Sequence, residues 1–165
     1  MDKNEYEVFI SWSTKYSGQV AFFLQEIILD ILKIEAYISD RNIVLGKNWF
    51  QNLKETLAQT KICVVCITNE NQRKPWLLFE SGIIYRNNFE ESNSGVFSIF
   101  IDIKGLPEKH PLSHFQGEEF TKEGVKILLE EINGILKAVD TKIALKNFNK
   151  LWDKVYKQRF NELKK

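Results

Sequence analysis

The amino-acid sequence predicts an α/β fold, a flavodoxin-like doubly wound parallel sheet of order 2-1-3-4-5 with helices on both faces. Short segments rich in β-branched and aromatic residues alternate along the chain with longer segments of helical periodicity. Right-handed crossovers leave few topologies for such an alternation. The chain of 165 residues is 44% hydrophobic and has only 8 Gly and 3 Pro, which is typical of one core without linkers. We therefore expect a single domain over residues 1–165.

The expected strands and helices follow one another in regular order. β-Branched runs predict strands, and apolar residues three or four apart predict helices. The expected strands cover residues 7–11, 35–39, 63–67 and 96–102, and the long loop 104–119 has room for a fifth, short strand. The expected helices cover residues 17–31, 48–59, 75–87, 121–138 and 141–162. Ser17 is the expected cap of the first helix, and Pro75 suits the first turn of the third.

Several functional classes lose support from composition and motifs. A net charge of +1 does not favour a general nucleic-acid binder. The longest apolar run has six residues, against about 20 for a membrane span. The N-terminus lacks the apolar segment of a signal peptide, so a cytoplasmic location is expected. The chain has no GxGxxG, GxxxxGKS/T, HExxH or GxSxG motif, which disfavours dinucleotide oxidoreductases, P-loop NTPases, zinc proteases and α/β-hydrolases.

The cysteines and histidines do not predict a metal site. Cys63 and Cys66 form a CxxC pair inside a β-branched strand, where their side chains point to opposite faces and cannot reach one metal ion. We expect both to be inert core residues. His110 and His114 are four residues apart, but Pro111 between them argues against a shared helical face.

Residues 141–165 are expected to form a basic amphipathic C-terminal helix. They carry eight basic and two acidic side chains, whereas the rest of the chain has more acidic than basic residues. Lysines recur every fourth position opposite an apolar stripe. This face is either solvated, which the sequence favours, or docked against an acidic partner or nucleic acid.

The expected ligand crevice lies beyond the carboxyl ends of the strands. In an open parallel sheet, ligands bind where the winding reverses, which here is between the first and third strands. Ser11, Trp12 and Ser13 follow the first strand at this point. Trp76 and Glu80 stand four residues apart at the start of a helix, so the carboxylate is expected beside the indole.

Four segments resemble the successive boxes of a Toll/interleukin-1 receptor (TIR) domain. They are VFISWS, AYISDRNIVLGKNW, KICVVCITNEN and PWLLFESG, in matching order and spacing through about residue 100. The Trp-x-x-x-Glu motif of TIR enzymes falls on Trp76 and Glu80, and the loop 40–48 resembles the BB loop of the family. The compact chain is similar to bacterial TIR proteins of antiphage defence.

The resemblance implies the TIR fold and an NAD+ nucleosidase (NADase) or ADP-ribosyl cyclase. NAD+ would be the substrate, with no separate cofactor, and cleavage of the bond between nicotinamide and ribose would give ADP-ribose or a cyclic ADP-ribose. Glu80 is the implied catalytic residue, and a solvent-facing helix residue is the alternative. The candidate substrate-binding residues are Ser11, Trp12, Ser13, Asp40, Lys47, Trp49 and Trp76. Each could instead serve packing, loop geometry or a solvated surface.

Two alternatives to this enzyme stay open. Receptor and adaptor TIR domains act by homotypic assembly in signalling, so a non-catalytic interaction module is the first. A nucleotide-sugar or deoxyribosyl transferase of related α/β build is the second.

Self-association is expected through the loop 40–48. Its consecutive residues Ile43, Val44 and Leu45 either offer apolar surface to a second TIR domain or fold back onto their own domain. The chain shows no sensor segment, so a separate activating or effector protein is expected, whereas neither a membrane nor nucleic acid is expected as a partner.

Overall fold

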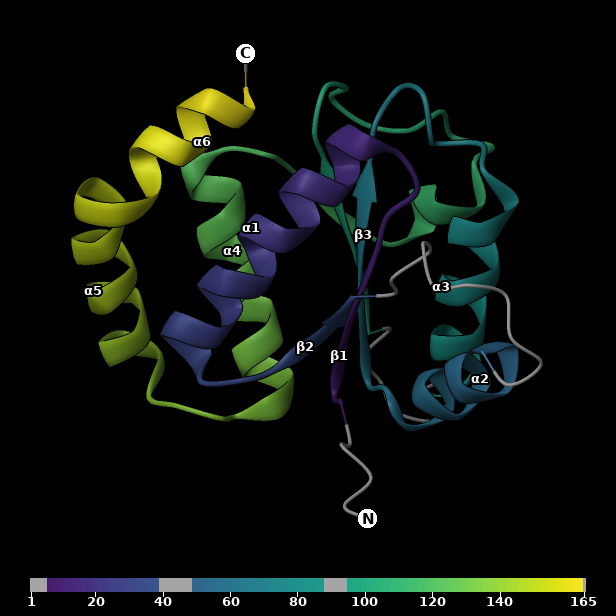
Figure 1. The fold of residues 1–165 in the computed structure, drawn as a ribbon, viewed down its shortest axis with the longest axis horizontal. Helices are drawn as coiled ribbons and strands as arrows, with labels where there is room; N and C mark the ends of the chain where they lie inside the picture. The colour runs from purple at the N-terminus through teal and green to yellow at the C-terminus, as the bar shows by residue number, and fades with distance from the viewer. Residues whose placement is uncertain (1–5, 39–48, 88–94, 165) are drawn as a thin grey trace.

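The computed structural model describes residues 6–38, 49–87 and 95–164, without the side chains of Trp49 and Asn87, and shows a parallel sheet between two layers of helices (Figure 1). The strands are β1 (Val8–Ser11), β2 (Ala36–Ile38), β3 (Ile62–Ile67), β4 (Val96–Phe100) and β5 (Gln116–Glu119). Their order in the sheet is β2-β1-β3-β4-β5, and every neighbouring pair is parallel. The predicted 2-1-3-4-5 order is therefore confirmed.

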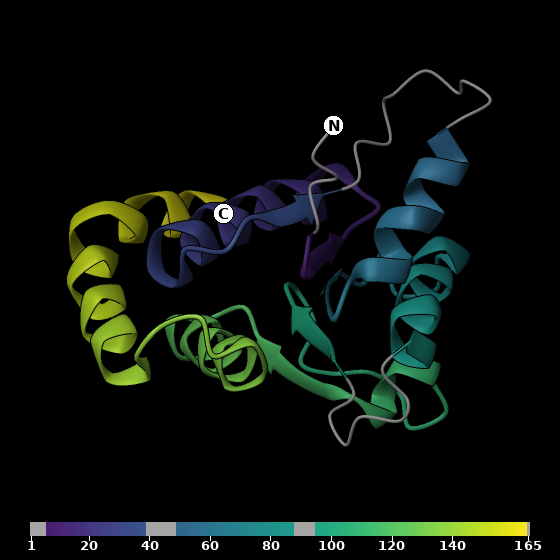
Figure 2. The same cartoon turned by 90° about the horizontal axis from the view of Figure 1, so that it is seen from below.

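Helices cover both faces of this sheet (Figures 1 and 2). They are α1 (Lys15–Leu32), α2 (Trp49–Gln59), α3 (Pro75–Asn87), the short 3-10 turn η1 (Pro111–His114), α4 (Lys122–Leu136), α5 (Thr141–Leu151), the π turn η2 (Trp152–Tyr156) and α6 (Lys157–Leu163). Side chains of α1 and α4 pack on one face of the sheet, with α5 packed on the outside of these two helices, and side chains of α2 and α3 pack on the other face. None of the described helices is both long and apolar enough to cross a membrane.

The first helix begins earlier than the sequence predicts. Its N-cap is Thr14, and Ser17 stands at the third helical position rather than at the cap. The two residues form a capping box, in which the Thr14 backbone N–H donates to Ser17 Oγ at 2.9 Å and the Thr14 side chain accepts from the Ser17 N–H. These reciprocal bonds satisfy two backbone donors that a helix start leaves open, so the prediction of Ser17 as the cap is wrong.

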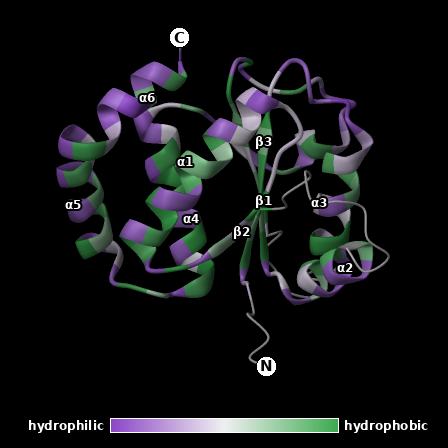
Figure 3. Cartoon of the chain, viewed as in Figure 1, coloured by the Kyte–Doolittle hydropathy of each residue, from purple (hydrophilic) through white to green (hydrophobic). Residues whose placement is uncertain are grey.

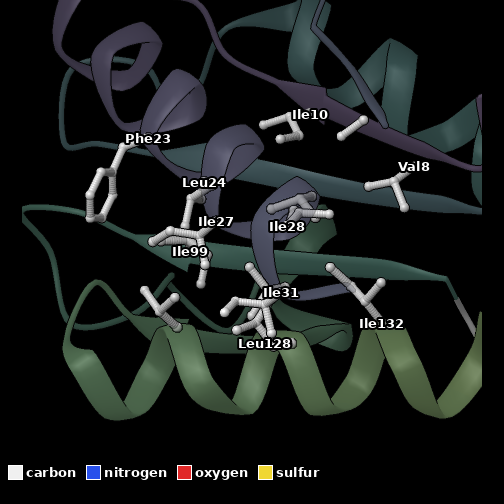
Figure 4. Close-up of a cluster of buried hydrophobic side chains, with 14 of the residues drawn as sticks. Val8, Ile10, Phe23, Leu24, Ile27, Ile28, Ile31, Ile99, Leu128 and Ile132 are labelled. Atoms are coloured by element: carbon white, nitrogen blue, oxygen red, sulfur yellow. The ribbon is translucent and has the colours of Figure 1, made fainter. Parts of the chain in front are cut away.

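Strand alternation sorts the core into two clusters, one on each face of the sheet. In β1, Val8 and Ile10 face the α1 side, where most of the apolar surface is buried (Figure 4), while Phe9 faces the α3 side. Cys63 and Cys66 are buried in opposite clusters, as predicted for two residues at an odd spacing along one strand. The strands β1, β3 and β4 are largely apolar and buried (Figure 3), as expected where helices cover both faces of a sheet, whereas the edge strand β5 is polar.

The basic C-terminal segment packs on α1 through aromatic side chains. Phe148, Trp152 and Tyr156 are buried, and the Tyr156 hydroxyl donates to Asp30 Oδ2 at 2.6 Å. The segment is not one regular α-helix, because the π turn η2 separates α5 from α6. Its outer face carries exposed lysines, namely Lys142, Lys146, Lys150, Lys154 and Lys157.

The replacement of Phe23 by alanine is expected to lower the free energy of unfolding by about 3–5 kcal/mol. Phe23 is fully buried, and its ring meets the rings of Phe120 and Tyr156 edge-on at centroid distances of 6.0 and 6.1 Å. The adjacent Phe22 is 51% exposed, so Phe22→Ala is the matched control and should change stability by less than about 0.5 kcal/mol. Urea denaturation measures both, and equal effects would refute the packing of the C-terminal segment on Phe23.

Candidate active site

Glu80 lies in the second turn of α3 and faces the sheet. Its side chain is 0% exposed, and its helix neighbours Leu77, Ser81 and Ile84 are buried on the same side of α3. The alternative that Glu80 is a solvent-facing helix residue is therefore wrong. A carboxylate in this position loses its hydration, which is costly unless protein groups replace the lost hydrogen bonds.

Ser11 supplies one of those hydrogen bonds. It is the last residue of β1, and strand alternation places its side chain on the α3 face, like that of Phe9. The Ser11 hydroxyl donates to Oε2 of Glu80, and Ser11 is itself 0% exposed. Two predicted site residues that are 69 positions apart in the chain are thus brought into direct contact.

The turn that leads from β3 into α3 is held by side-chain hydrogen bonds. Thr68 N–H donates to Asn71 Oδ1 at 2.7 Å, and the Asn71 amide donates to the Cys66 carbonyl at 2.9 Å. His110 adds a contact from outside the turn, since its Nε2 lies 2.6 Å from the Gln72 carbonyl oxygen. These bonds fix the path of the chain into Pro75 and hence the position of α3 over the sheet.

A buried thiol lies near the carboxylate. Cys63 is fully buried on the same face of the sheet, in register with Phe9 of β1. Burial, the charge of Glu80 and the neighbouring Cys66 raise the pKa of the Cys63 thiol well above its ordinary value. The thiol is therefore neutral near pH 7 and supplies no thiolate nucleophile.

Trp76 stands one helical turn before Glu80, in the first turn of α3, which follows β3 at the carboxyl edge of the sheet. Its side chain is partly buried against the α3-side cluster. The indole stacks on the ring of Phe79, with centroids 5.3 Å apart, and Phe79 stacks on Phe50 of α2, with centroids 6.1 Å apart. We call Trp76, Phe79 and Phe50 the aromatic row. Phe50 and Phe79 are not among the residues that the sequence predicts for the site, although each lies within one turn of a tryptophan at the start of its helix.

Trp12 and Ser13 pack at the start of α1. The Trp12 ring belongs to the α1-side cluster and covers Gly18, where a Cβ atom would lie 2.8 Å from it. The Ser13 N–H donates to Ser17 Oγ at 3.1 Å. These contacts place the two residues on the opposite side of the sheet from the Ser11–Glu80 pair.

Three other candidate positions cannot be compared with the structure. Asp40 and Lys47 lie outside the described residues, as does the whole loop 40–48. Trp49 opens α2, but its side chain is outside them too. Their roles in substrate binding stay predictions.

A groove of about 1310 Å³ opens at the carboxyl edge of the sheet, on the α1 side. It is lined by the start of α1, the loops after β3 and β4, and the end of α6, including Ser13, Tyr16, Lys74, Asp102 and Arg159. Burial and the nearby Asp102 raise the pKa of Tyr16. Glu80 and Trp76 do not line this groove, so the predicted crevice and the buried carboxylate are separate features of the same edge.

No group of three or more His, Cys, Asp or Glu side chains suited to a metal ion occurs within the described ranges. His110 instead stabilises the fold, because its Nδ1 accepts a hydrogen bond from the Leu112 N–H while its Nε2 contacts the Gln72 carbonyl oxygen.

Comparison with known sequences assigns the family. Residues 8–129 match the profile of the family described as TIR domain, and this range contains β1, α3 and therefore Ser11, Trp76 and Glu80. No curated protein matches the chain. Since the match covers well over half of the sequence and the strand order agrees, this chain belongs to the TIR domain family.

Proposed function

We propose that this chain cleaves NAD+ at the bond between nicotinamide and ribose, as an NAD+ nucleosidase or ADP-ribosyl cyclase that acts in the cytoplasm in bacterial defence or signalling. The observation that carries the proposal is the hydrogen bond from the Ser11 hydroxyl to the Glu80 carboxylate, one helical turn from Trp76. TIR domains include NAD+-cleaving members, and Trp76 and Glu80 stand at the positions of the motif of those members.

The chemistry needs one well-placed negative charge. Nicotinamide leaves as a neutral pyridine, so it requires no proton donor, unlike the alcohol that leaves in glycoside hydrolysis. As the bond breaks, positive charge develops on the ribose ring, and an ionised Glu80 would stabilise it or bind the ribose hydroxyls. Such stabilisation is stronger in a site with little water than in bulk solvent. Attack by water then gives ADP-ribose, and attack by a group of the same molecule gives a cyclic product.

Ser11 would orient the carboxylate rather than bind the substrate directly. Its hydroxyl already donates to Glu80, and a hydrogen bond to a charged group contributes about 1.5–3 kcal/mol. We expect Ser11→Ala to lower kcat about tenfold. Since the hydrogen bond favours the charged form, its loss should also move the acid limb of the pH–rate profile to higher pH.

Ser81→Ala is the control for that substitution. Ser81 is also buried in α3, but its hydroxyl donates to the Leu77 carbonyl at 2.6 Å, within its own helix. This variant should keep the rate and the pH profile of the wild type. A Ser11→Ala enzyme with an unchanged pH profile would contradict the orienting role, whatever its rate.

A non-catalytic interaction module is the second candidate, and the burial of Glu80 favours it. A carboxylate that is 0% exposed in the single chain can meet a ribose only after the groups around it move apart. Self-association of TIR domains, together with a separate activating or effector protein, would have to supply that change. A domain that only assembles would need no such opening.

Incubation of the purified protein with NAD+ distinguishes the two. The expected result is release of nicotinamide, which chromatography measures. Mass spectrometry of the second product distinguishes ADP-ribose from a cyclic ADP-ribose. Deoxynucleosides in the same assay test the transferase alternative. Absence of nicotinamide release across a range of protein concentrations, with assembly observed by light scattering, would replace the enzyme with the interaction module.

A further inference from the structure

The outer face of the C-terminal segment carries a row of lysines without acidic neighbours in contact. We call Lys142, Lys146, Lys150, Lys154 and Lys157 the lysine stripe. All five are exposed, and none of their ammonium groups takes part in an ion pair within residues 6–38, 49–87 and 95–164. The helix rises by about 22 Å along the stripe, which is longer than a small-molecule ligand needs.

The π turn η2 keeps this stripe on one side of the segment. Residues four apart on an α-helix drift around its axis by about 40° per step, because one turn takes about 3.6 residues. In η2 the Lys157 N–H donates to the Trp152 carbonyl, five residues earlier, and this wider turn reverses part of the drift. Phe148, Trp152 and Tyr156 can therefore all stay buried on the α1 side while the lysines stay on the opposite face.

The surroundings of the stripe favour a protein surface over nucleic acid or a membrane. The large apolar side chains that this segment exposes are Ile143 and Val155, so its outer face offers no exposed ring for stacking on a base. The aromatic residues that could enter a lipid interface are buried on the other side of the segment, against α1. An acidic protein surface is the partner that a row of lysines alone fits best.

A groove on the same chain has the complementary chemistry. It has a volume of about 250 Å³ and lies between α4 and the edge strand β5. Ile99, Ile127 and Leu128 give it an apolar lining, and Ile99 and Leu128 are seen facing one another in Figure 4. Glu118 and Glu131 also line it; both are partly exposed, and neither has an ion pair within the described part of the chain. We call it the carboxylate groove.

Strand alternation turns Glu118 towards α4. A Cβ atom on Gly117 would lie 2.5 Å from the ring of Phe100, which packs on the α3 side of the sheet. The next residue of β5 therefore faces the α4 side, where Glu131 stands. Two carboxylates beside an apolar lining suit an ammonium on an aliphatic stem, because a lysine packs its methylene groups on apolar surface and keeps its charge among polar groups.

We propose that the lysine stripe of one copy of this chain docks in the carboxylate groove of a second copy. Each copy carries both surfaces, and their charges are opposite, so the complementarity is present within one sequence. Because the stripe and the groove are different surfaces, the contact is heterologous and can repeat from copy to copy. It uses neither Glu80 nor the loop 40–48, so it does not depend on NAD+ cleavage or on the contact expected for that loop.

Charge reversal tests this contact through association alone. The stripe variant is Lys146→Glu with Lys150→Glu, and the groove variant is Glu118→Lys with Glu131→Lys. Each should weaken self-association about tenfold or more in analytical ultracentrifugation, because like charges then face one another. A mixture of the two variants should associate more tightly than either variant alone, since every stripe then finds a groove of opposite charge. The loop 40–48 is identical in all samples and contributes equally to each.

Lys104→Glu with Lys109→Glu is the matched control, because both lysines are exposed and lie outside the stripe. It should leave association unchanged. Glu118→Gln with Glu131→Gln removes the charge of the groove with little change in volume and should also weaken association, so the test holds if lysines at these positions prevent folding. Melting temperatures verify that each variant is folded.

Three outcomes overturn the proposal. The first is a wild type that stays monomeric at every concentration, and the second is a pair of folded reversal variants that associate like the wild type. The third is a mixture that associates no more tightly than its components, because the stripe then meets a different acidic surface. Binding of 1,5-diaminopentane by a monomeric wild type, lost in the groove variant, would instead make the groove a site for a small diamine.

Discussion

The replacement of Glu80 by glutamine is expected to lower the rate of nicotinamide release by about 100-fold or more while the fold stays intact. Glutamine is nearly isosteric with glutamate, and its carbonyl oxygen can still accept the hydrogen bond from Ser11. It cannot offer a negative charge to the ribose as positive charge develops there. The measurement is the initial rate of nicotinamide release from NAD+ by wild type and variant at equal protein concentration.

The same variant has a second expected property. Since Glu80 is fully buried, its ionised form costs free energy in the folded state that the neutral amide does not. The melting temperature of Glu80→Gln should therefore equal or exceed that of the wild type. A normal melting temperature with more than about a tenth of the wild-type rate would rule out Glu80 as the catalytic carboxylate, because a principal electrostatic group contributes more than about 1.4 kcal/mol.

The second large effect is expected from protein concentration. In a single chain the carboxylate is 0% exposed, so only a rearranged, minor population can bind the ribose. If association of TIR domains favours that population, specific activity should fall about tenfold or more over a hundredfold dilution, since the apparent activity follows the fraction of competent chains. Nicotinamide release and light scattering on the same samples relate turnover to assembly.

A substitution in the loop 40–48 tests the same dependence of activity on self-association. The loop lies outside the described residues, but its sequence contains the apolar run Ile43 to Leu45. Val44→Asp should lower both self-association and turnover and leave the monomer folded, because a charge at an apolar contact opposes association. If specific activity stays constant on dilution and Val44→Asp has no effect on it, one chain carries a complete site.

Much of the architecture could be predicted because it depends on local periodicity. Strand segments and helix segments differ in the spacing of their apolar residues, and right-handed crossovers then leave few arrangements, so the order 2-1-3-4-5 followed from the sequence. Helix starts depend on more than periodicity. Thr14 and Ser17 are both good capping residues, and only the hydrogen bonds of the folded chain show that Thr14 is the cap.

The sequence by itself determined the positions of Trp76 and Glu80 on one helix, because residues four apart on an α-helix share a face. Only the tertiary structure decided that this face meets the sheet, that Ser11 donates to the carboxylate, and that Trp12 packs on the other side of the sheet. It also joined Phe50 of α2 to Phe79 of α3 in the aromatic row. Such contacts depend on how strands align and how helices lie across them, and no spacing within one segment encodes the distance between side chains from two segments.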